Sequence, residues 1–382
     1  MQRNSMKWLT LVMAFVMVVS MMVGCQPKQP DPPVKTDVPS TESPEPPTTE
    51  APTETAPSAD TKVFTDSVGR EIHIPKVITR LAPSGPLAQV ILFTAAPDRL
   101  CALARPFGDP QVALFGPEYA ELPNIGQFYG KSPNFNLEAA LLADPQVIVD
   151  LGQAKGSIVE DMDNMMDQIN IPTVFIEAPF EGMPQAYRDL GEMIGETERT
   201  EQLAVYCEET LKSAAHAKAS IPEDEQVRVY WAMGDLGLNT NAVGSFHSEA
   251  LALAPVVNVA DVEPASRGGG SEVSLEQIIQ WDPDYILAES AALVDEIKND
   301  PAWSTLRAVR EDHILVVPSV PYGFLADPPS VNRYGGLRWL CAHFAPDYFG
   351  KGVEDEVRDF FELFYGVTLD DATLEKILAG TF

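Results

Sequence analysis

The chain has 382 residues, of which 45% are hydrophobic and 21% are charged, a composition typical of a globular protein long enough for two domains. Its formal net charge is −30, and nearly all of that charge lies after residue 62. A surface this acidic excludes nucleic acid and anionic lipid as direct partners and favours solubility outside the cell.

The N-terminal segment has the pattern of a secretory signal peptide. Arg3 and Lys7 precede an apolar run over residues 9–23, which is too short and wrongly flanked for a stable membrane span. The run ends in Gly-Cys, which resembles the bacterial lipoprotein box, in which the cysteine becomes the lipidated first residue. We therefore predict a lipoprotein signal over residues 1–25 with Cys25 as the lipidation site. The alternative is an ordinary signal peptide with an incidental cysteine.

A segment rich in Pro, Thr, Glu and Ser follows, over residues 26–62, and it has no apolar periodicity. It cannot bury enough surface to fold, so we predict a disordered tether. At about 3.1 Å per residue, such a tether could reach on the order of 100 Å. A lipidated cysteine before this spacer places the folded part on the outer face of the cell membrane, with the lipid anchor as its sole membrane attachment.

Residues 63–195 are predicted to form an α/β lobe. They begin with a hairpin that turns at Val68-Gly69. Strands and helices then alternate at the spacing of βαβ units, which implies a mostly parallel sheet covered on both faces. The predicted strands are 77–85, 98–104, 146–151 and 172–178, and the predicted helices are 86–94, 137–144 and 158–169.

The next segment, residues 196–220, has a helical pattern that no Gly or Pro interrupts before Pro222. A helix of this length spans roughly 35 Å, enough to pass from one lobe to another as a stiff connector. The remaining residues, 221–382, repeat the earlier alternation and are predicted to form a second α/β lobe with C-terminal helices. Its predicted elements are strands at 227–233 and 313–319, a helix at 248–254 and a helix–strand unit at 274–287.

One helix–strand unit occurs twice, 138 residues apart. Residues 136–149 read "NLEAALLADPQVIV" and residues 274–287 read "SLEQIIQWDPDYIL". Each begins with a helix-capping residue followed by Leu-Glu, and each ends at Asp-Pro before a strand. The repeat indicates two similar Rossmann-like α/β lobes joined by one long helix. Because ligands bind beyond the carboxyl ends of parallel strands, we predict a ligand cleft between the lobes.

The order of these segments resembles the helical-backbone class of solute-binding proteins of ABC importers, from about Val63 to the C-terminus. Members of this class capture iron–siderophore complexes, haem or vitamin B12 outside the cytoplasmic membrane. The resemblance implies a monomer that delivers its solute to a permease dimer with its ATPase. The segments that carry it are "TDSVGREIHIP", "FNLEAALLADPQVIV", the connecting helix, "VSLEQIIQWDPDYIL", "DPAWSTLRAV" and "PPSVNRYGGLRWL".

In that class, a glutamate on each lobe docks onto arginines of the permease. The Leu-Glu pairs of the repeated unit match those positions, so the resemblance implies a docking role for Glu138 and Glu276. The alternative is purely local, because a carboxylate in the first turn of a helix is favoured by the helix dipole.

A cleft for a bulky metal chelate needs aromatic surfaces and arginines, whose planar fork suits carboxylates and phenolates. The candidates follow predicted strands or precede helices: Arg105, Tyr129, Trp231, His247, Arg267, Tyr322 and Arg333. Each arginine could instead form an ion pair and each aromatic residue could belong to the core. His247 could ligate a haem iron or cap a helix. The favoured ligand is an iron–siderophore or haem-type complex, with a corrinoid or a nickel or cobalt chelate as alternatives.

Two other classes of site find little support. The remaining histidines, His73, His216, His313 and His343, are scattered, so no bare-metal site is expected. Cys101, Cys207 and Cys341 lack metal-ligand spacing and are interpreted as buried hydrophobic residues, with one disulfide as the alternative.

An enzyme is not expected. Ser245 lies near His247, but neither G-x-S-x-G nor H-E-x-x-H is present, and "RGGGSE" lacks the dinucleotide fingerprint. We therefore expect no catalytic residues and no cofactor. A lipid-anchored sensor or adhesin built on the same fold stays open. Neighbouring genes for a permease and an ATPase would favour the importer.

Overall fold

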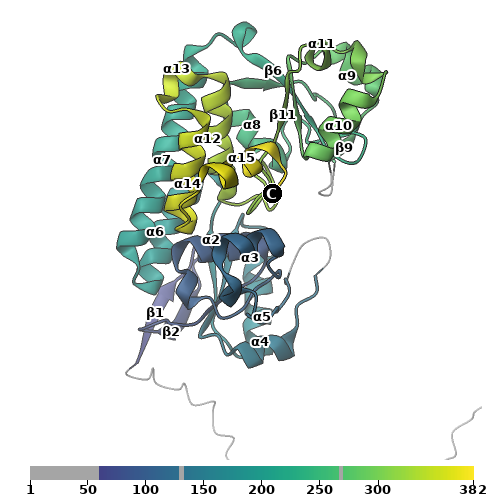
Figure 1. Ribbon diagram of the computed structural model, residues 1–382. Helices are drawn as coiled ribbons and strands as arrows, with labels where there is room; N and C mark the ends of the chain where they lie inside the picture. Colours follow the sequence, from purple (N-terminus) through teal and green to yellow (C-terminus); the bar gives the residue numbers. More distant parts are fainter. Residues whose placement is uncertain (1–59, 129–132, 266–269) are drawn as a thin grey trace, which may run out of the picture. The chain divides into compact units, whose positions relative to one another are not determined.

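A computed structural model describes residues 60–128, 133–265 and 270–382 (Figure 1). The predicted signal peptide, Cys25 and almost all of the predicted tether lie outside these residues. The first strand begins at Thr61, two residues before the predicted start of the folded part. In the described ranges, no helix is both long enough and apolar enough to cross a membrane.

The N-terminal lobe begins with the predicted hairpin, which turns at Gly69 with φ of 82°. A sheet of three parallel strands follows, in the order β3-β4-β5. The predicted strand at 98–104 is absent, because Leu100 and Leu103 make only single bridges to neighbouring chain segments. The elements of this lobe are β1 (Thr61–Thr65), β2 (Glu71–Pro75), β3 (Leu81–Pro83), α2 (Pro86–Ala95), α3 (Asp109–Phe115), α4 (Leu137–Ala143), β4 (Val147–Gly152), α5 (Ile158–Ile169) and β5 (Thr173–Glu177).

Two packed helices connect the lobes. α6 (Met183–Ile194) was not anticipated from the sequence, and it packs side by side with α7. α7 (Thr197–Ser220) is the long continuous connector, and it runs along one side of the molecule in Figure 1. Its buried positions include Leu203 and Cys207. The connector is therefore anchored along its length by packing.

The C-terminal lobe has a sheet of four parallel strands in the order β11-β10-β6-β8. A short antiparallel pair, β7 with β9, lies outside this sheet. The elements of this lobe are β6 (Val227–Ala232), β7 (Asn239–Thr240), α8 (Glu249–Leu253), β8 (Val256–Asn258), β9 (Ser271–Glu272), α9 (Leu275–Trp281), β10 (Tyr285–Ala288), α10 (Ala291–Asn299), α11 (Arg307–Arg310) and β11 (Ile314–Val316).

The C-terminal helices contact both lobes, whereas the sequence assigned them to the second lobe alone. Phe364 packs against Tyr187 of α6 and Tyr206 of α7, and Arg199 of α7 donates to the carbonyl of Phe364. This happens because α14 carries an apolar face that must be buried, and α12, α2 and Tyr206 of α7 provide the surface. The helices are α12 (Asn332–Phe344), α13 (Pro346–Phe349), α14 (Val353–Tyr365) and α15 (Asp371–Ala379).

Candidate ligand cleft and docking surface

A cavity of about 430 Å³ lies where the predicted cleft was expected, at the carboxyl ends of the N-terminal strands. Its N-terminal wall is formed by the residues that follow β3, by the end of β4, and by the first turn of α2. The opposite wall contains His247 and residues 326–329. Both halves of the chain therefore contribute to one cavity, as expected for ligand sites beyond parallel strands.

Two polar residues on the N-terminal wall form a pair. The Ser84 hydroxyl donates to the Asp150 carboxylate, with 2.5 Å between the oxygens. Burial raises the pKa of Asp150, whereas the hydrogen bond from Ser84 and the charge of Lys155 oppose the shift. Burial thus favours the protonated form of Asp150 over the carboxylate.

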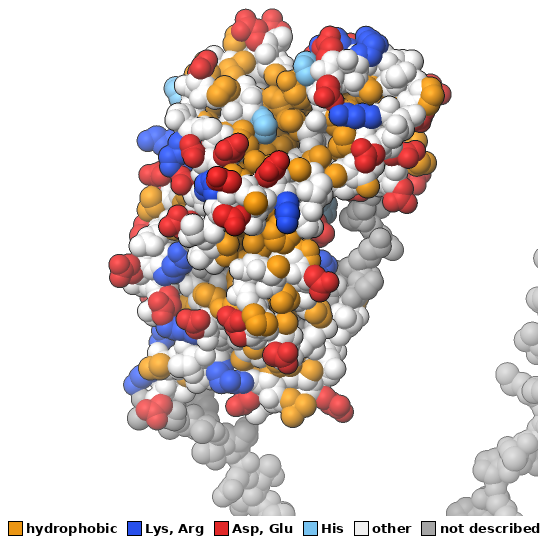
Figure 2. All heavy atoms as spheres, in the orientation of Figure 1, with side chains coloured by type: hydrophobic (Ala, Val, Ile, Leu, Met, Phe, Trp, Pro, Cys, Tyr) orange, Lys and Arg blue, Asp and Glu red, His pale blue; other side chains and the backbone are white. Residues whose placement is uncertain are grey.

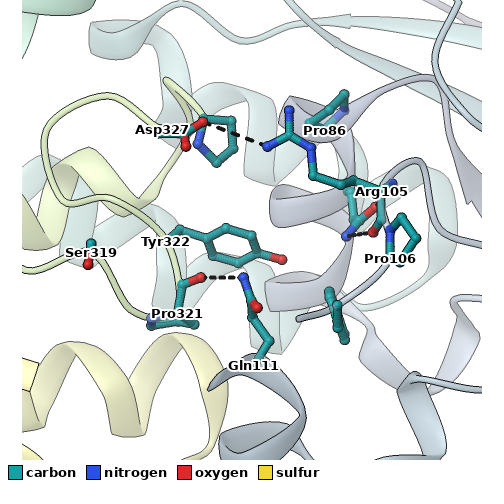
Figure 3. A pocket seen from close by; sticks show the side chains of 11 residues that line it. Pro86, Arg105, Pro106, Gln111, Ser319, Pro321, Tyr322 and Asp327 are labelled. Carbon is teal, nitrogen blue, oxygen red and sulfur yellow. Dashed lines mark hydrogen bonds and ion pairs between the residues drawn. The ribbon is translucent and has the colours of Figure 1, made fainter. Parts of the chain in front are cut away.

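Hydrogen bonds fix the backbone of Arg105, whereas its exposed guanidinium can reorient. The side chain of buried Gln89 accepts hydrogen bonds from the amides of Ala104 and Arg105 and donates to the Arg105 carbonyl. The guanidinium lies 3.8 Å from the Asp327 carboxylate, and the two side chains are 60% and 86% exposed (Figure 3). Such an exposed ion pair is worth little and can open when an anion arrives.

A smaller chamber of about 100 Å³ adjoins the cavity and shares Arg105 and Asp327 with it. Tyr322 lines this chamber, and burial raises the pKa of its hydroxyl, so the phenol is neutral at physiological pH. Nearby, the Gln111 amide donates to the Pro321 carbonyl at 2.8 Å and links the two walls (Figure 3). Of the predicted ligand contacts, Arg105 and Tyr322 therefore lie together.

His247 lines the main cavity and also a second cavity beside β7. Burial lowers the pKa of His247, partly offset by a hydrogen bond with the Ala326 backbone. The imidazole is therefore neutral at physiological pH and can accept a hydrogen bond or bind a metal of a ligand.

Two predicted ligand contacts lie elsewhere. Trp231 is buried in the core of the C-terminal lobe and lines neither cavity. Arg333 is 1% exposed, and its guanidinium pairs with Glu249 at 2.6 Å. It also lies over the rings of Phe180 and Phe246, 4.6 and 5.2 Å from their centroids. The structure therefore assigns Arg333 to packing between the lobes, because its charge is already satisfied there.

The remaining predicted contacts, Tyr129 and Arg267, lie outside the described residues. Sequence reasoning missed Ser84 and Asp150, although both follow or end predicted strands. The rule that placed the cleft at strand ends would have found them if it had been applied to small polar residues as well as to arginines and aromatics.

The described residues contain no group of three or more His, Cys, Asp or Glu side chains that could hold a metal ion. Cys101, Cys207 and Cys341 are all free and buried, as the first of the two interpretations predicted. Acidic side chains are spread over the face of the molecule in Figure 2, in keeping with the net charge.

The repeated unit folds the same way in both lobes. Helices α4 and α9 each begin at a side-chain cap, with Asn136 accepting from Ala139 and Ser274 accepting from Gln277. Each ends at an aspartate in the left-handed region, with φ of 47° at Asp144 and 41° at Asp282.

The two predicted docking glutamates occupy equivalent first-turn positions on these helices. Glu138 and Glu276 are exposed, and neither makes an ion pair or side-chain hydrogen bond with the part of the chain that the structure describes. Their carboxylates are therefore available to a partner.

Comparison with known proteins shows a family match and several similar solute-binding proteins. The family described as "Periplasmic binding protein" matches residues 116–321. A solved ABC transporter solute binding protein from Sulfurospirillum deleyianum is 30% identical, with a TM-score of 0.75, over 82% of this chain and 98% of its own. The molybdate-binding protein MolA of Haemophilus influenzae is 23% identical over 80% of this chain and 91% of its own. A periplasmic haem-binding protein from Pseudomonas aeruginosa is 18% identical, with a TM-score of 0.52, over 71% of this chain and 94% of its own.

Proposed function

Because the chain belongs to the periplasmic binding protein family, and so is a solute-binding protein of an ABC importer, we propose that it is lipid-anchored at Cys25 and captures an anionic metal chelate. The observation that carries the proposal is Arg105, a weakly paired cation shared by the main cavity and the smaller chamber. A ferric siderophore or a haem-type complex presents the carboxylates or phenolates that an arginine binds best.

The rest of the cavity supports an anionic ligand. The first turn of α2 contributes Leu87 and Ala88 to the wall, and no acidic residue lies in that turn. A helix N-terminus carries a partial positive charge and free amide groups that favour anions. Burial also raises the pKa of Asp150, so protonation of this carboxylate beside an anion costs less than it would in water. A neutral His247 could bind the metal of a chelate with an open coordination position.

A metal oxyanion is a second candidate. The specific observations are the α2 first turn at the cavity wall and the relative that is named for molybdate and matches most of this chain. An oxyanion would use the amide groups and Arg105, with no need for an aromatic surface.

The test begins with protein purified from its own host and examined by native mass spectrometry and absorption spectroscopy. Calorimetric titrations with ferric chelates, haem, a corrinoid and molybdate then rank the classes. Arg105→Ala should weaken binding of an anionic ligand by about 10- to 100-fold, since a charge-assisted hydrogen bond is worth about 1.5–3 kcal/mol. Arg310→Ala, which removes a cation that lines none of the three cavities described above, is the matched control. Unchanged affinity in Arg105→Ala would exclude the proposed anion site.

The docking role of Glu138 and Glu276 completes the proposal. Charge reversal at either position should block uptake and leave ligand affinity and thermal stability nearly unchanged, because both side chains are exposed and unpaired in the described chain. A reversal that unfolds the protein or abolishes ligand binding would favour the helix-dipole explanation.

A further inference from the structure

The duplicated helices expose more than a glutamate. On α4, Leu141 follows Glu138 by three residues and is 52% exposed. On α9, Ile279 follows Glu276 by three residues and is 41% exposed. Residues three apart on a helix lie on one face, with about 5–6 Å between their Cβ atoms. Each lobe therefore presents an unpaired carboxylate beside an exposed branched aliphatic side chain.

The pairing does not follow from the fold of each lobe. The two helices agree at two adjacent positions: Ala140 and Ile278 are buried, and the next residues, Leu141 and Ile279, are exposed. An outward aliphatic side chain stabilises neither core. In both lobes an exposed aliphatic side chain follows an unpaired glutamate by three residues, although the lobes otherwise differ in sequence. This repetition points to contact with a partner protein.

We infer that Leu141 and Ile279 are apolar anchors that bury against the importer's permease beside the glutamate contacts. This inference rests on the proposed docking of Glu138 and Glu276. Because this chain repeats the same pair of side chains, its partner should carry two copies of one binding site, as a dimer of equivalent permease subunits does. Each of these two binding sites on the permease should combine a cationic group for the glutamate with an apolar recess for the aliphatic side chain. The acidic carboxylates set orientation, and the aliphatic groups add an attraction that salt does not screen.

The two contributions differ in their salt dependence, which separates them experimentally. Exposed ion pairs weaken as ionic strength rises, because the Debye length falls from about 10 Å at 0.1 M to about 3 Å at 1 M. Burial of an aliphatic side chain does not weaken in this way. Affinity of the full-length protein for the cognate permease–ATPase complex in nanodiscs should be measured at low and at high salt.

Leu141→Ser and Ile279→Ser should each lower that affinity by about tenfold at both salt concentrations, and by similar factors because the two sites are equivalent. Glu138→Lys and Glu276→Lys should lower it mainly at low salt. Val205→Ser, at an exposed aliphatic position on α7, is the matched control and should bind as the wild type does. Circular dichroism melts and ligand titrations verify that each variant is folded and loaded.

The outcomes separate the anchor from the docking proposal on which it rests. If the serine variants bind as tightly as the wild type while the lysine variants fail, the anchors are wrong and the glutamate docking stands. If both sets bind as the wild type does, the docking surface itself is wrong. If only one serine variant weakens binding, or if Val205→Ser weakens it equally, the matched-pair explanation is overturned.

Discussion

The ion pair between buried Arg333 and half-buried Glu249 leads to a quantitative stability prediction. Arg333 lies at the start of α12, between Phe180 after β5 and Phe246 before α8. Its guanidinium also donates to the Phe246 carbonyl at 3.2 Å. Substitution by alanine would remove the cation between two rings and leave the Glu249 carboxylate without its partner.

The structure sets the magnitude. Removal of one partner from a fully buried pair costs about 3–5 kcal/mol. The Glu249 side chain is 32% exposed, so water can partly solvate the abandoned carboxylate, and the lower end of that range applies. We therefore expect Arg333→Ala to lower the free energy of unfolding by about 3 kcal/mol.

Urea denaturation, with the midpoint and slope compared with those of the wild type, measures this loss. Lys351→Ala is the control, because Lys351 pairs with Asp359 at the surface and such pairs contribute about 0–1 kcal/mol. A loss below about 1 kcal/mol in Arg333→Ala would refute the packing role. A large loss of ligand affinity at unchanged stability would return Arg333 to the ligand site, where the sequence first placed it.

Three further predictions follow from the anchor, the connector and a buried histidine. Cys25→Ser should release the protein from membranes on fractionation, and unchanged retention would count against lipidation. Small-angle scattering with and without ligand should barely differ, because α7 is continuous and packed along its length; a large compaction would contradict a stiff connector. Burial lowers the pKa of His343 from 6.5 to about 4, so this side chain binds a proton more readily in the unfolded protein than in the folded one. The free energy of unfolding should therefore fall as the pH drops from about 6.5 toward 4. His343→Phe should flatten that part of the curve of unfolding free energy against pH, and an unchanged slope would show that other groups cause it.

Local sequence signals predicted most of the elements. The predicted helix 158–169 matches α5, because its apolar residues recur at helical spacing and bury one face. The hairpin and the repeated unit were also predictable, since their turn and capping residues act within a few positions.

Features that depend on distant parts of the chain were not predictable. Arg333 and Arg105 were both predicted as ligand contacts, but Glu249 and two phenylalanines surround Arg333 only in the folded chain. The predicted strand at 98–104 has suitable β-formers, yet only isolated bridges form there. Likewise, nothing local shows that α14 packs on α2 of the other lobe.

The stiff connection that we predict between the lobes would affect docking. Each exposed glutamate contact is worth only about 0.2–1 kcal/mol alone, so useful affinity requires that both lobes engage at once. Fixed spacing makes the second contact effectively intramolecular, and this gain shrinks if the lobes can move apart. Arg333→Met keeps an apolar side chain between the two phenylalanine rings but removes the ion pair with Glu249. At a temperature where this variant is fully folded, it should bind the permease complex several-fold more weakly, although no docking residue has changed. Small-angle scattering shows whether Arg333→Met is more flexible than the wild type. If it is, and it still binds the permease complex as tightly as the wild type does, the spacing of the two lobes does not control docking.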